Sequence, residues 1–127
     1  MARKKEQEVA ASQKSGTKEG FRDAFKKAVT EMLVLRMLDE REMYAYEMIR
    51  EIGSRTEGAL SFNTLYLAIY RLKDLGYIEE AGTKVEGNRA RVYFRISQAG
   101  RERLAELIEE YRLLTGAVER ILQGEEL

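Results

Sequence analysis

Residues 61–82 read SFNTLYLAIYRLKDLGYIEEAG, a helix-like run that passes through a single glycine into a shorter, strand-like segment. With successive helical residues about 100° apart, Leu65, Ile69 and Leu72 fall in one arc with Ala68, which is typical of a face that packs on a core. The opposite arc holds two tyrosines, an amide and flanking cations: Asn63, Tyr66, Leu67, Tyr70 and Asp74, with Arg71 and Lys73 at its edges. Such a surface suits the major groove of DNA, where amides and arginines reach base edges and hydroxyls reach phosphates. The alternative is that Tyr66 and Tyr70 pack against neighbouring elements.

Three helices are expected before the strand-like segment. Apolar residues at helical spacing from Phe21 to Leu38 predict a first helix that buries both faces. Residues 43–52 predict a short second helix that ends at Gly53. The third helix is expected to begin at Ser61, whose hydroxyl can cap its first amides, and to end at Leu75 before Gly76.

Two antiparallel strands should follow, over residues 77–81 and 91–96. In the second strand Arg91, Tyr93 and Arg95 are expected to point outward, with Val92, Phe94 and Ile96 inward. The intervening stretch TKVEGNRA supplies a Gly-Asn turn and predicts a flexible, projecting tip. Its polar and basic residues would follow the phosphate backbone or enter the minor groove: Lys84, Asn88, Arg89 and Arg91. The alternative is a charged hairpin that is simply solvated.

This order of elements predicts a winged helix-turn-helix fold, mainly α with a small antiparallel hairpin. We assign residues 1–18 to a disordered basic arm, because they mix charge with Ala, Ser and Gly and hold almost no large apolar residue. Its lysines either contact DNA or are simply solvated. Residues 19–96 form the expected DNA-binding domain, and residues 97–127 form a long C-terminal helix.

The C-terminal helix carries a heptad seam. Its apolar residues step by 3 and 4 from Leu104 to Ile121, which indicates a coiled-coil contact. The predicted dimerisation set combines this seam with two phenylalanines of the first helix: Phe21, Phe25, Leu104, Leu107, Ile108, Tyr111, Leu114, Val118 and Ile121. The alternative is an intramolecular packing helix.

Composition excludes several functional classes. The 127-residue chain has no cysteine and no histidine, which removes thiol catalysis, thiolate and imidazole metal ligation, and the commonest general base near neutral pH. No phosphate-binding glycine motif is present. We therefore expect no enzyme activity, no cofactor and no metal site. No apolar run is long enough to span a bilayer and no signal-peptide pattern occurs, so a cytoplasmic, nucleoid-associated protein without a membrane partner is expected.

The charge distribution favours a polyanionic partner although the net charge is zero, with 22 basic and 22 acidic residues. Residues 83–95 carry four cations against one glutamate, whereas residues 101–127 carry four cations and seven acids. The wing end is therefore basic and the C-terminal end acidic, as expected if only one end meets DNA.

The sequence also resembles the PadR-like transcriptional regulators. The resemblance lies in AYEMIREI (45–52), LSFNTLYLAIYRLKDLGYIE (60–79), GNRARVYFRIS (87–97) and QAGRERL (98–104). It implies a homodimeric bacterial repressor that binds a double-stranded DNA operator. Its third helix would enter the major groove, and Tyr46, Thr64, Tyr66 and Arg91 match family positions that face DNA.

Two departures from the family pattern concern proline, which this chain lacks. Leu67 follows Tyr66 where many members have proline, and GNRAR replaces a Gly-x-Pro-x-Lys/Arg wing. Some members respond to phenolic acids or flat cationic drugs, so a small aromatic effector is a candidate partner. Phe21, Phe25, Met32 and Tyr111 could line a cavity for it, although such residues at helical spacing also form ordinary cores.

Two functional classes remain. The first is a DNA-binding regulator, and the second is a winged-helix module that has lost DNA binding and joins another protein through its heptad helix. The cations of the expected wing favour the first, because charged rims add little affinity to a protein contact.

Overall fold

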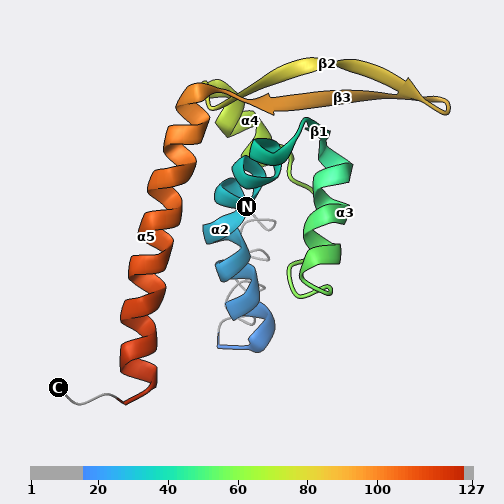
Figure 1. Ribbon diagram of the computed structural model, residues 1–127. Helices are drawn as coiled ribbons and strands as arrows, with labels where there is room; N and C mark the ends of the chain where they lie inside the picture. The colour runs from blue at the N-terminus through green and yellow to red at the C-terminus, as the bar shows by residue number, and fades with distance from the viewer. Residues whose placement is uncertain (1–15, 125–127) are drawn as a thin grey trace, which may run out of the picture. The chain divides into compact units, whose positions relative to one another are not determined.

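The computed structural model describes residues 16–124 and has the predicted fold class, a winged helix-turn-helix (Figure 1). Within this range four helices accompany a three-stranded antiparallel sheet. In chain order the elements are α2 (Lys18–Glu40), β1 (Met43–Tyr44), α3 (Ala45–Arg55), α4 (Tyr66–Asp74), β2 (Ile78–Glu86), β3 (Arg89–Ile96) and α5 (Gln98–Leu122). Of the predicted N-terminal arm, residues 1–15 lie outside the described residues.

The chain divides into two compact units, one ending at Thr30 and the other running Glu31–Leu127. In the first unit, the Thr17 hydroxyl accepts a hydrogen bond from the Gly20 amide at 3.0 Å and caps the start of α2. Phe21 is 75% exposed and Phe25 37%. The expectation that the first helix buries both faces is therefore wrong for this stretch of the chain.

The second helix begins later and ends later than predicted. Met43 and Tyr44 form β1 instead, because they pair with Phe94 and Tyr93 of β3 and are buried there. Helix α3 then continues through Gly53 to Arg55. A glycine with ordinary helical backbone angles does not end a helix unless the following residues also leave it.

The third helix begins at Tyr66, and the predicted cap at Ser61 is wrong. Leu65 occupies the N-cap position, and the Thr64 hydroxyl accepts a hydrogen bond from the Tyr66 amide at 3.2 Å. A capping side chain bonds amides two or three residues further along, so Ser61, five residues before Tyr66, is too far away to cap this helix. Leu65 is 2% exposed, so its burial fixes the direction in which α4 leaves the turn.

The hairpin is longer and tighter than predicted. Strands β2 and β3 stay paired out to Glu86 and Arg89, so most of the expected flexible tip is strand and only Gly87–Asn88 forms the turn. Gly87 has φ +63°, the left-handed conformation that a glycine at the first position of a two-residue hairpin turn readily adopts. Figure 1 shows the hairpin extending well past α3.

The predicted inward and outward faces of β3 need correction. Tyr93 is 8% exposed although it was expected outside, and Val92 is 38% exposed although it was expected inside. A bulge between Glu80 and Gly82 shifts the register of β2 against β3, and Tyr44 of β1 covers the Tyr93 ring. Simple alternation fails where a bulge and a third strand intervene.

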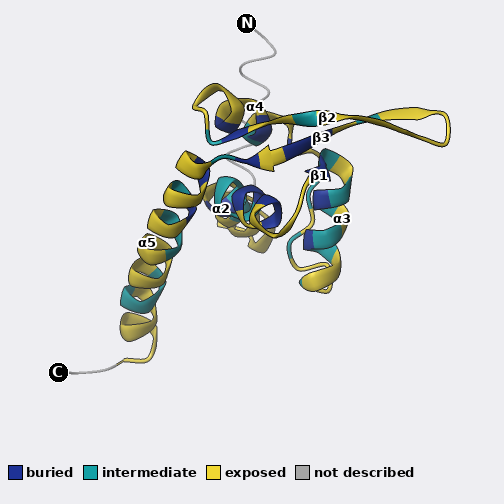
Figure 2. Ribbon diagram, turned by 45° about the horizontal axis from the view of Figure 1, so that its top comes forward, coloured by how far each residue is buried: buried dark blue, intermediate teal, exposed yellow. Residues whose placement is uncertain are grey.

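The core of the second unit lies where the end of α2 meets β1, α3, α4, the base of the hairpin and the beginning of α5, and Figure 2 shows the outer hairpin exposed beyond it. Almost fully buried side chains form its centre: Leu35, Met43, Met48, Leu65, Ile69, Leu72, Ile78 and Val34. This core joins the α4 helix to the base of the hairpin through Leu72, Ile78 and Phe94.

Helix α5 begins as predicted at Ser97, which is its N-cap. The Ser97 hydroxyl accepts a hydrogen bond from the Gly100 amide at 3.0 Å and donates one to the Gly76 carbonyl at 2.6 Å. The Ser97 amide donates to the Tyr77 carbonyl at 3.0 Å. The first turn of α5 is thus bound to the connection between α4 and β2.

Candidate nucleic-acid interface

A groove of about 240 Å³ lies between α3, α4 and the hairpin, and we call it the aromatic groove. Its lining combines aromatic side chains with two cations and one acid: Tyr44, Ala45, Tyr46, Tyr66, Ile69, Tyr70, Lys73, Glu80, Ala90, Arg91, Val92 and Phe94. Five residues that the sequence nominated for DNA contact, namely Tyr46, Tyr66, Tyr70, Lys73 and Arg91, therefore meet in one place. They come from three separate stretches of the chain.

The two tyrosines of α4 lie on its solvent side. Tyr66 is 57% exposed and Tyr70 55%, and their rings stack with centroids 6.0 Å apart and an interplanar angle of 24°. One turn of helix separates them, so both hydroxyls point away from the face that carries Ile69 and Leu72. In this structure neither tyrosine is part of the core.

Helix α3 adds a third exposed tyrosine. Tyr46 is 55% exposed, and the Arg50 guanidinium lies 5.3 Å from its ring centroid. Arg50 Nη2 also donates a hydrogen bond to the Tyr44 hydroxyl at 2.9 Å. One arginine therefore orients both tyrosines at the start of α3.

The hairpin of β2 and β3, which we call the wing, is attached to β1 through aromatic rings and cations. Tyr44 and Tyr93 meet edge to face with centroids 5.3 Å apart. The Arg91 guanidinium lies 4.8 Å from the Tyr44 centroid, and Lys84 Nζ lies 4.5 Å from the Tyr93 centroid. Since aromatic and cation–π contacts of this kind each stabilise by about 0.5–1.5 kcal/mol, the two contacts to Tyr44 help to hold the hairpin against β1, directly before α3.

Arg91 itself is half-buried, and its Nε is buried without a hydrogen-bond partner among the described residues. The guanidinium lines the aromatic groove, where an anionic oxygen could accept from it.

Tyr93 also ties the hairpin to its own tip. Its hydroxyl donates a hydrogen bond to Glu86 Oε1 at 2.6 Å. This bond to the Glu86 carboxylate, followed by burial, raises the pKa of Tyr93 to about 12. The neutral phenol is therefore the form present at physiological pH.

The two cations of α4 are both ion-paired. Arg71 Nη1 lies 3.2 Å from Glu31 Oε2, and Lys73 Nζ lies 3.4 Å from Glu80 Oε1. Arg71 does not line the aromatic groove, whereas Lys73 and Glu80 both do. These two ion pairs therefore partly neutralise the positive charge that the sequence predicts for α4.

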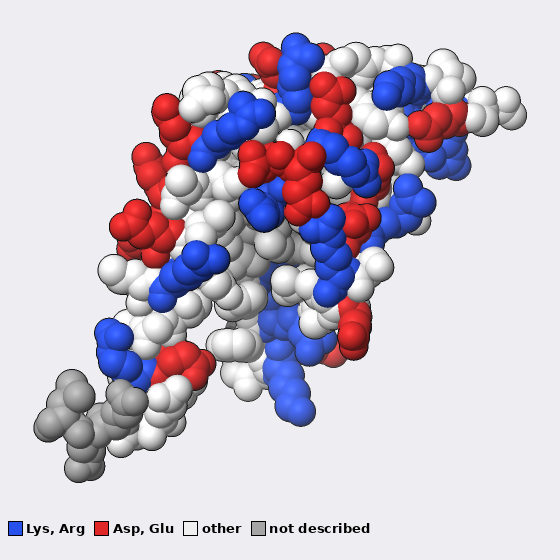
Figure 3. All heavy atoms as spheres, in the orientation of Figure 1, with Lys and Arg blue, Asp and Glu red and all other residues white. Residues whose placement is uncertain are grey.

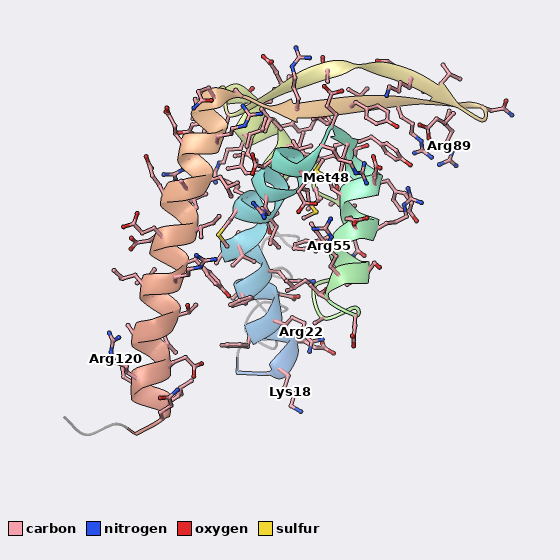
Figure 4. The ribbon with its side chains drawn as sticks, in the orientation of Figure 1. Lys18, Arg22, Met48, Arg55, Arg89 and Arg120 are labelled. Carbon is pink, nitrogen blue, oxygen red and sulfur yellow. The ribbon has the colours of Figure 1, made fainter. Side chains whose placement is uncertain are left out.

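The remaining nominated DNA contacts lie outside the groove. Ser61, Asn63 and Thr64 are exposed in the segment before α4, and the Thr64 hydroxyl is engaged by the Tyr66 amide. Lys84 lies on β2 over Tyr93, and Asn88 is in the hairpin turn. Arg89 lies at the far end of the hairpin in Figure 4, and Figure 3 shows further Lys and Arg side chains along the hairpin with acidic ones between them.

The heptad seam of α5 divides into two parts. Leu104 is 4% exposed in the core of its own chain, and Leu107 and Ile108 pack partly against that core. The distal residues are more exposed: Tyr111 37%, Leu114 53%, Val118 54% and Ile121 81%. A contact with a second copy would therefore depend on the distal half of α5.

Four residues of this interface were not nominated from the sequence. Tyr44 was included in the predicted second helix and Tyr93 was expected on the outward face of its strand, and neither Arg50 nor Glu80 was given a role. Tyr44 and Arg50 both fall in or beside the segment AYEMIREI, six residues apart, but only the strand pairing of Tyr44 turns it toward Arg50 and Tyr93.

Other kinds of site find no support among residues 16–124. No group of three or more acidic side chains there is placed to hold a metal ion. The same stretch of chain contains no helix that is both long and apolar enough to cross a bilayer.

The fold and the groove define a winged-helix protein with an exposed aromatic and cationic face. The family model for the transcriptional regulator PadR-like family matches residues 34–106. This chain belongs to that family, whose members are transcriptional regulators. The match extends from the last turns of α2 to the first turns of α5, so it includes the whole aromatic groove.

Individual relatives agree with this placement. An uncharacterized protein X of Lysinibacillus sphaericus is 30% identical over 94 residues, covering 72% of this chain and 86% of that protein. A transcriptional regulator from Clostridium thermocellum is 27% identical with a TM-score of 0.68, covering 74% of this chain and 93% of that one. The fold also matches Bacillus subtilis PadR in complex with operator DNA, at 18% identity and a TM-score of 0.56, over 63% of this chain and 46% of that one.

Proposed function

We propose that this chain is a repressor that binds a pseudo-palindromic DNA operator as a homodimer. The observation that carries the proposal is the aromatic groove, in which three exposed tyrosines meet Lys73 and Arg91 beside a projecting hairpin. The fold match to Bacillus subtilis PadR supports a DNA partner, because that protein was solved with operator DNA.

In the proposed complex α4 is the recognition helix, which enters the major groove, and the hairpin follows the backbone. Tyr66 and Tyr70 present hydroxyls on the exposed side of α4, where they can reach phosphates or base edges. Asn63 precedes the helix and offers an amide suited to adenine. Other nominated residues supply phosphate contacts around this centre: Tyr46, Ser61, Thr64, Arg71, Lys73, Lys84, Asn88, Arg89 and Arg91.

The wing attachment supports this role because it places the cations before DNA arrives. Arg91 and Lys84 are held over Tyr44 and Tyr93, so their side chains are already ordered. A pre-ordered contact loses less conformational entropy on binding than a free side chain does. The hairpin would therefore dock as a unit with α3 and α4.

The proposed dimer uses the distal seam of α5. Leu114, Val118 and Ile121 are each more than half exposed in the single chain, at heptad spacing. Burying them against a second copy would remove this apolar stripe from water. A two-fold axis there would set the recognition helices about 34 Å apart, so that each meets one of two successive major grooves.

Repression would follow from occupation of a promoter near the chain's own gene. Release by a small aromatic effector is part of the same proposal, and it is supported by the resemblance to family members that respond to phenolic acids or flat cationic drugs.

Selection of bound fragments from a genomic library, followed by hydroxyl-radical footprinting, tests the proposal. Two protected half-sites about 10 base pairs apart on one face of the duplex are expected. Failure to enrich any fragment, with and without candidate aromatic effectors, would refute DNA regulation and favour the protein-interaction module.

A further inference from the structure

The ion pair inside the aromatic groove joins the recognition helix to the wing. Lys73 lies in the last turn of α4, and its Nζ is 3.4 Å from Glu80 Oε1 on β2. The two side chains are 40% and 55% exposed, so both remain accessible to solvent and to a phosphate. Exposed pairs of this kind contribute little to stability, so a change in this pair should affect DNA binding more than folding.

Strand geometry determines that Glu80 faces the groove and its neighbour does not. Glu80 is in register with Phe94, a groove residue, whereas Glu79 is in register with Arg95. Glu79 Oε1 accepts a hydrogen bond from Arg95 Nε at 2.7 Å. Successive residues of a strand point to opposite faces, so only the Glu80 carboxylate reaches Lys73.

We propose that Glu80 is an internal counter-ion that competes with DNA phosphate for Lys73 and thereby limits the affinity of the recognition helix for DNA of any sequence. The inference rests on the proposed function. A phosphate that binds Lys73 must either displace Glu80 or approach a pair whose net charge is near zero. The pair therefore withholds one cation per protomer from sequence-independent binding, which depends on such charges.

Removing the carboxylate has a measurable consequence. If Glu80→Gln lets each Lys73 neutralise one phosphate, the log–log slope of affinity against salt steepens by about 0.9 per protomer, or about 1.8 for a dimer. Over a change from about 200 to about 50 mM salt, the advantage of the variant over wild type then grows by about 12-fold. The effect should appear on scrambled DNA as well as on the operator, because phosphates carry no sequence information.

The experiment measures fluorescence anisotropy of the full chain with a labelled scrambled duplex and with the selected operator, across this salt range. Glu79→Gln is the matched control, since it removes the same charge from the adjacent residue, which is exposed to the same degree, 56% against 55%. The Lys73→Gln variant, alone and combined with Glu80→Gln, tests whether the effect passes through Lys73.

The expected result is tighter binding and a steeper slope for Glu80→Gln, no comparable change for Glu79→Gln, and no gain from Glu80→Gln when Lys73 is already Gln. Equal gains from the two glutamate variants would show a general charge effect and overturn the inference. A full gain in the Lys73→Gln background would also overturn it, because repulsion by Glu80 alone would then explain the change. If the wild-type chain binds DNA and Glu80→Gln binds it with the same affinity and salt slope, only this inference is refuted. If neither the wild-type chain nor any variant binds DNA, the proposed function is refuted as well.

Discussion

Gly100→Ala tests the junction that joins α5 to the DNA-binding elements. A Cβ added at Gly100 would lie 2.1 Å from the Tyr77 carbonyl oxygen and 2.7 Å from Ile96 Cγ1. The first distance is more than about 1 Å short of ordinary van der Waals contact. The Tyr77 carbonyl cannot simply turn aside, because it accepts the hydrogen bond from the Ser97 amide.

The expected loss follows from what must move. Forcing a methyl into a closely packed site costs about 1–3 kcal/mol, and displacing α5 weakens the two hydrogen bonds from Ser97 to the α4–β2 connection, at about 1 kcal/mol each. The higher helix propensity of alanine returns about 1 kcal/mol. The net destabilisation is therefore about 3 kcal/mol.

Urea denaturation at fixed protein concentration measures this change. If the free energy of unfolding falls by about 1.5 kcal/mol per molar urea, the midpoint should fall by about 2 M. Gly53→Ala is the matched control, because Gly53 lies within α3 with no atom from outside its own stretch of helix within 4 Å of the added Cβ, and it should raise the midpoint slightly. A Gly100→Ala midpoint equal to or above that of wild type would refute the close packing of α5 on Tyr77.

Three further predictions address the DNA face, the dimer and the wing. Tyr66→Ala should weaken operator binding at least tenfold in anisotropy without changing the dimer in sedimentation, and equal loss of both would mean that Tyr66 supports the fold. Leu114→Asp should give monomers by placing unpaired carboxylates in an apolar contact, whereas Arg112→Asp, off the seam, should leave the dimer intact. The bond from Tyr93 to Glu86 raises the pKa of Tyr93 to about 12, so the stability that this bond contributes is complete below about pH 10 and lost as the pH rises through 12. In the Glu86→Gln variant, NMR titration should show the pKa of Tyr93 falling toward 10. An unchanged pKa would contradict the hydrogen bond.

The helical periods, the hairpin signal and their order along the chain were sufficient to predict the fold class. The 3.6-residue period of α4 separates Ile69 and Leu72 from Tyr66 and Tyr70, and the burial of each residue confirms that separation. A long α5 starting at Ser97 also follows from local chemistry, since a serine cap and an uninterrupted apolar seam both lie within one segment.

Features that depend on distant pairing could not be predicted in this way. Strand β1 is two residues long, too short to show a period of two, and exists because it pairs with β3 about 50 residues later. The bulge after Glu80 and the cover from Tyr44 bring Tyr93 inside, against its apparent alternation. Glu80 and Lys73 lie on different elements and meet only in the folded chain, so the partial neutralisation of the charge on α4 could not be predicted from the sequence.

In the proposed function, the face formed by α4 and the wing binds any DNA through its charges and distinguishes the operator through contacts with the bases. Fluorescence anisotropy with a labelled duplex from upstream of the chain's own gene, against a scrambled duplex of equal length, tests this claim most directly when repeated over a range of salt. We expect tighter binding to the upstream duplex and, for about four phosphates neutralised per protomer, a log–log slope of roughly −7 for the dimer. Equal, weak and salt-insensitive binding to both duplexes would contradict the claim.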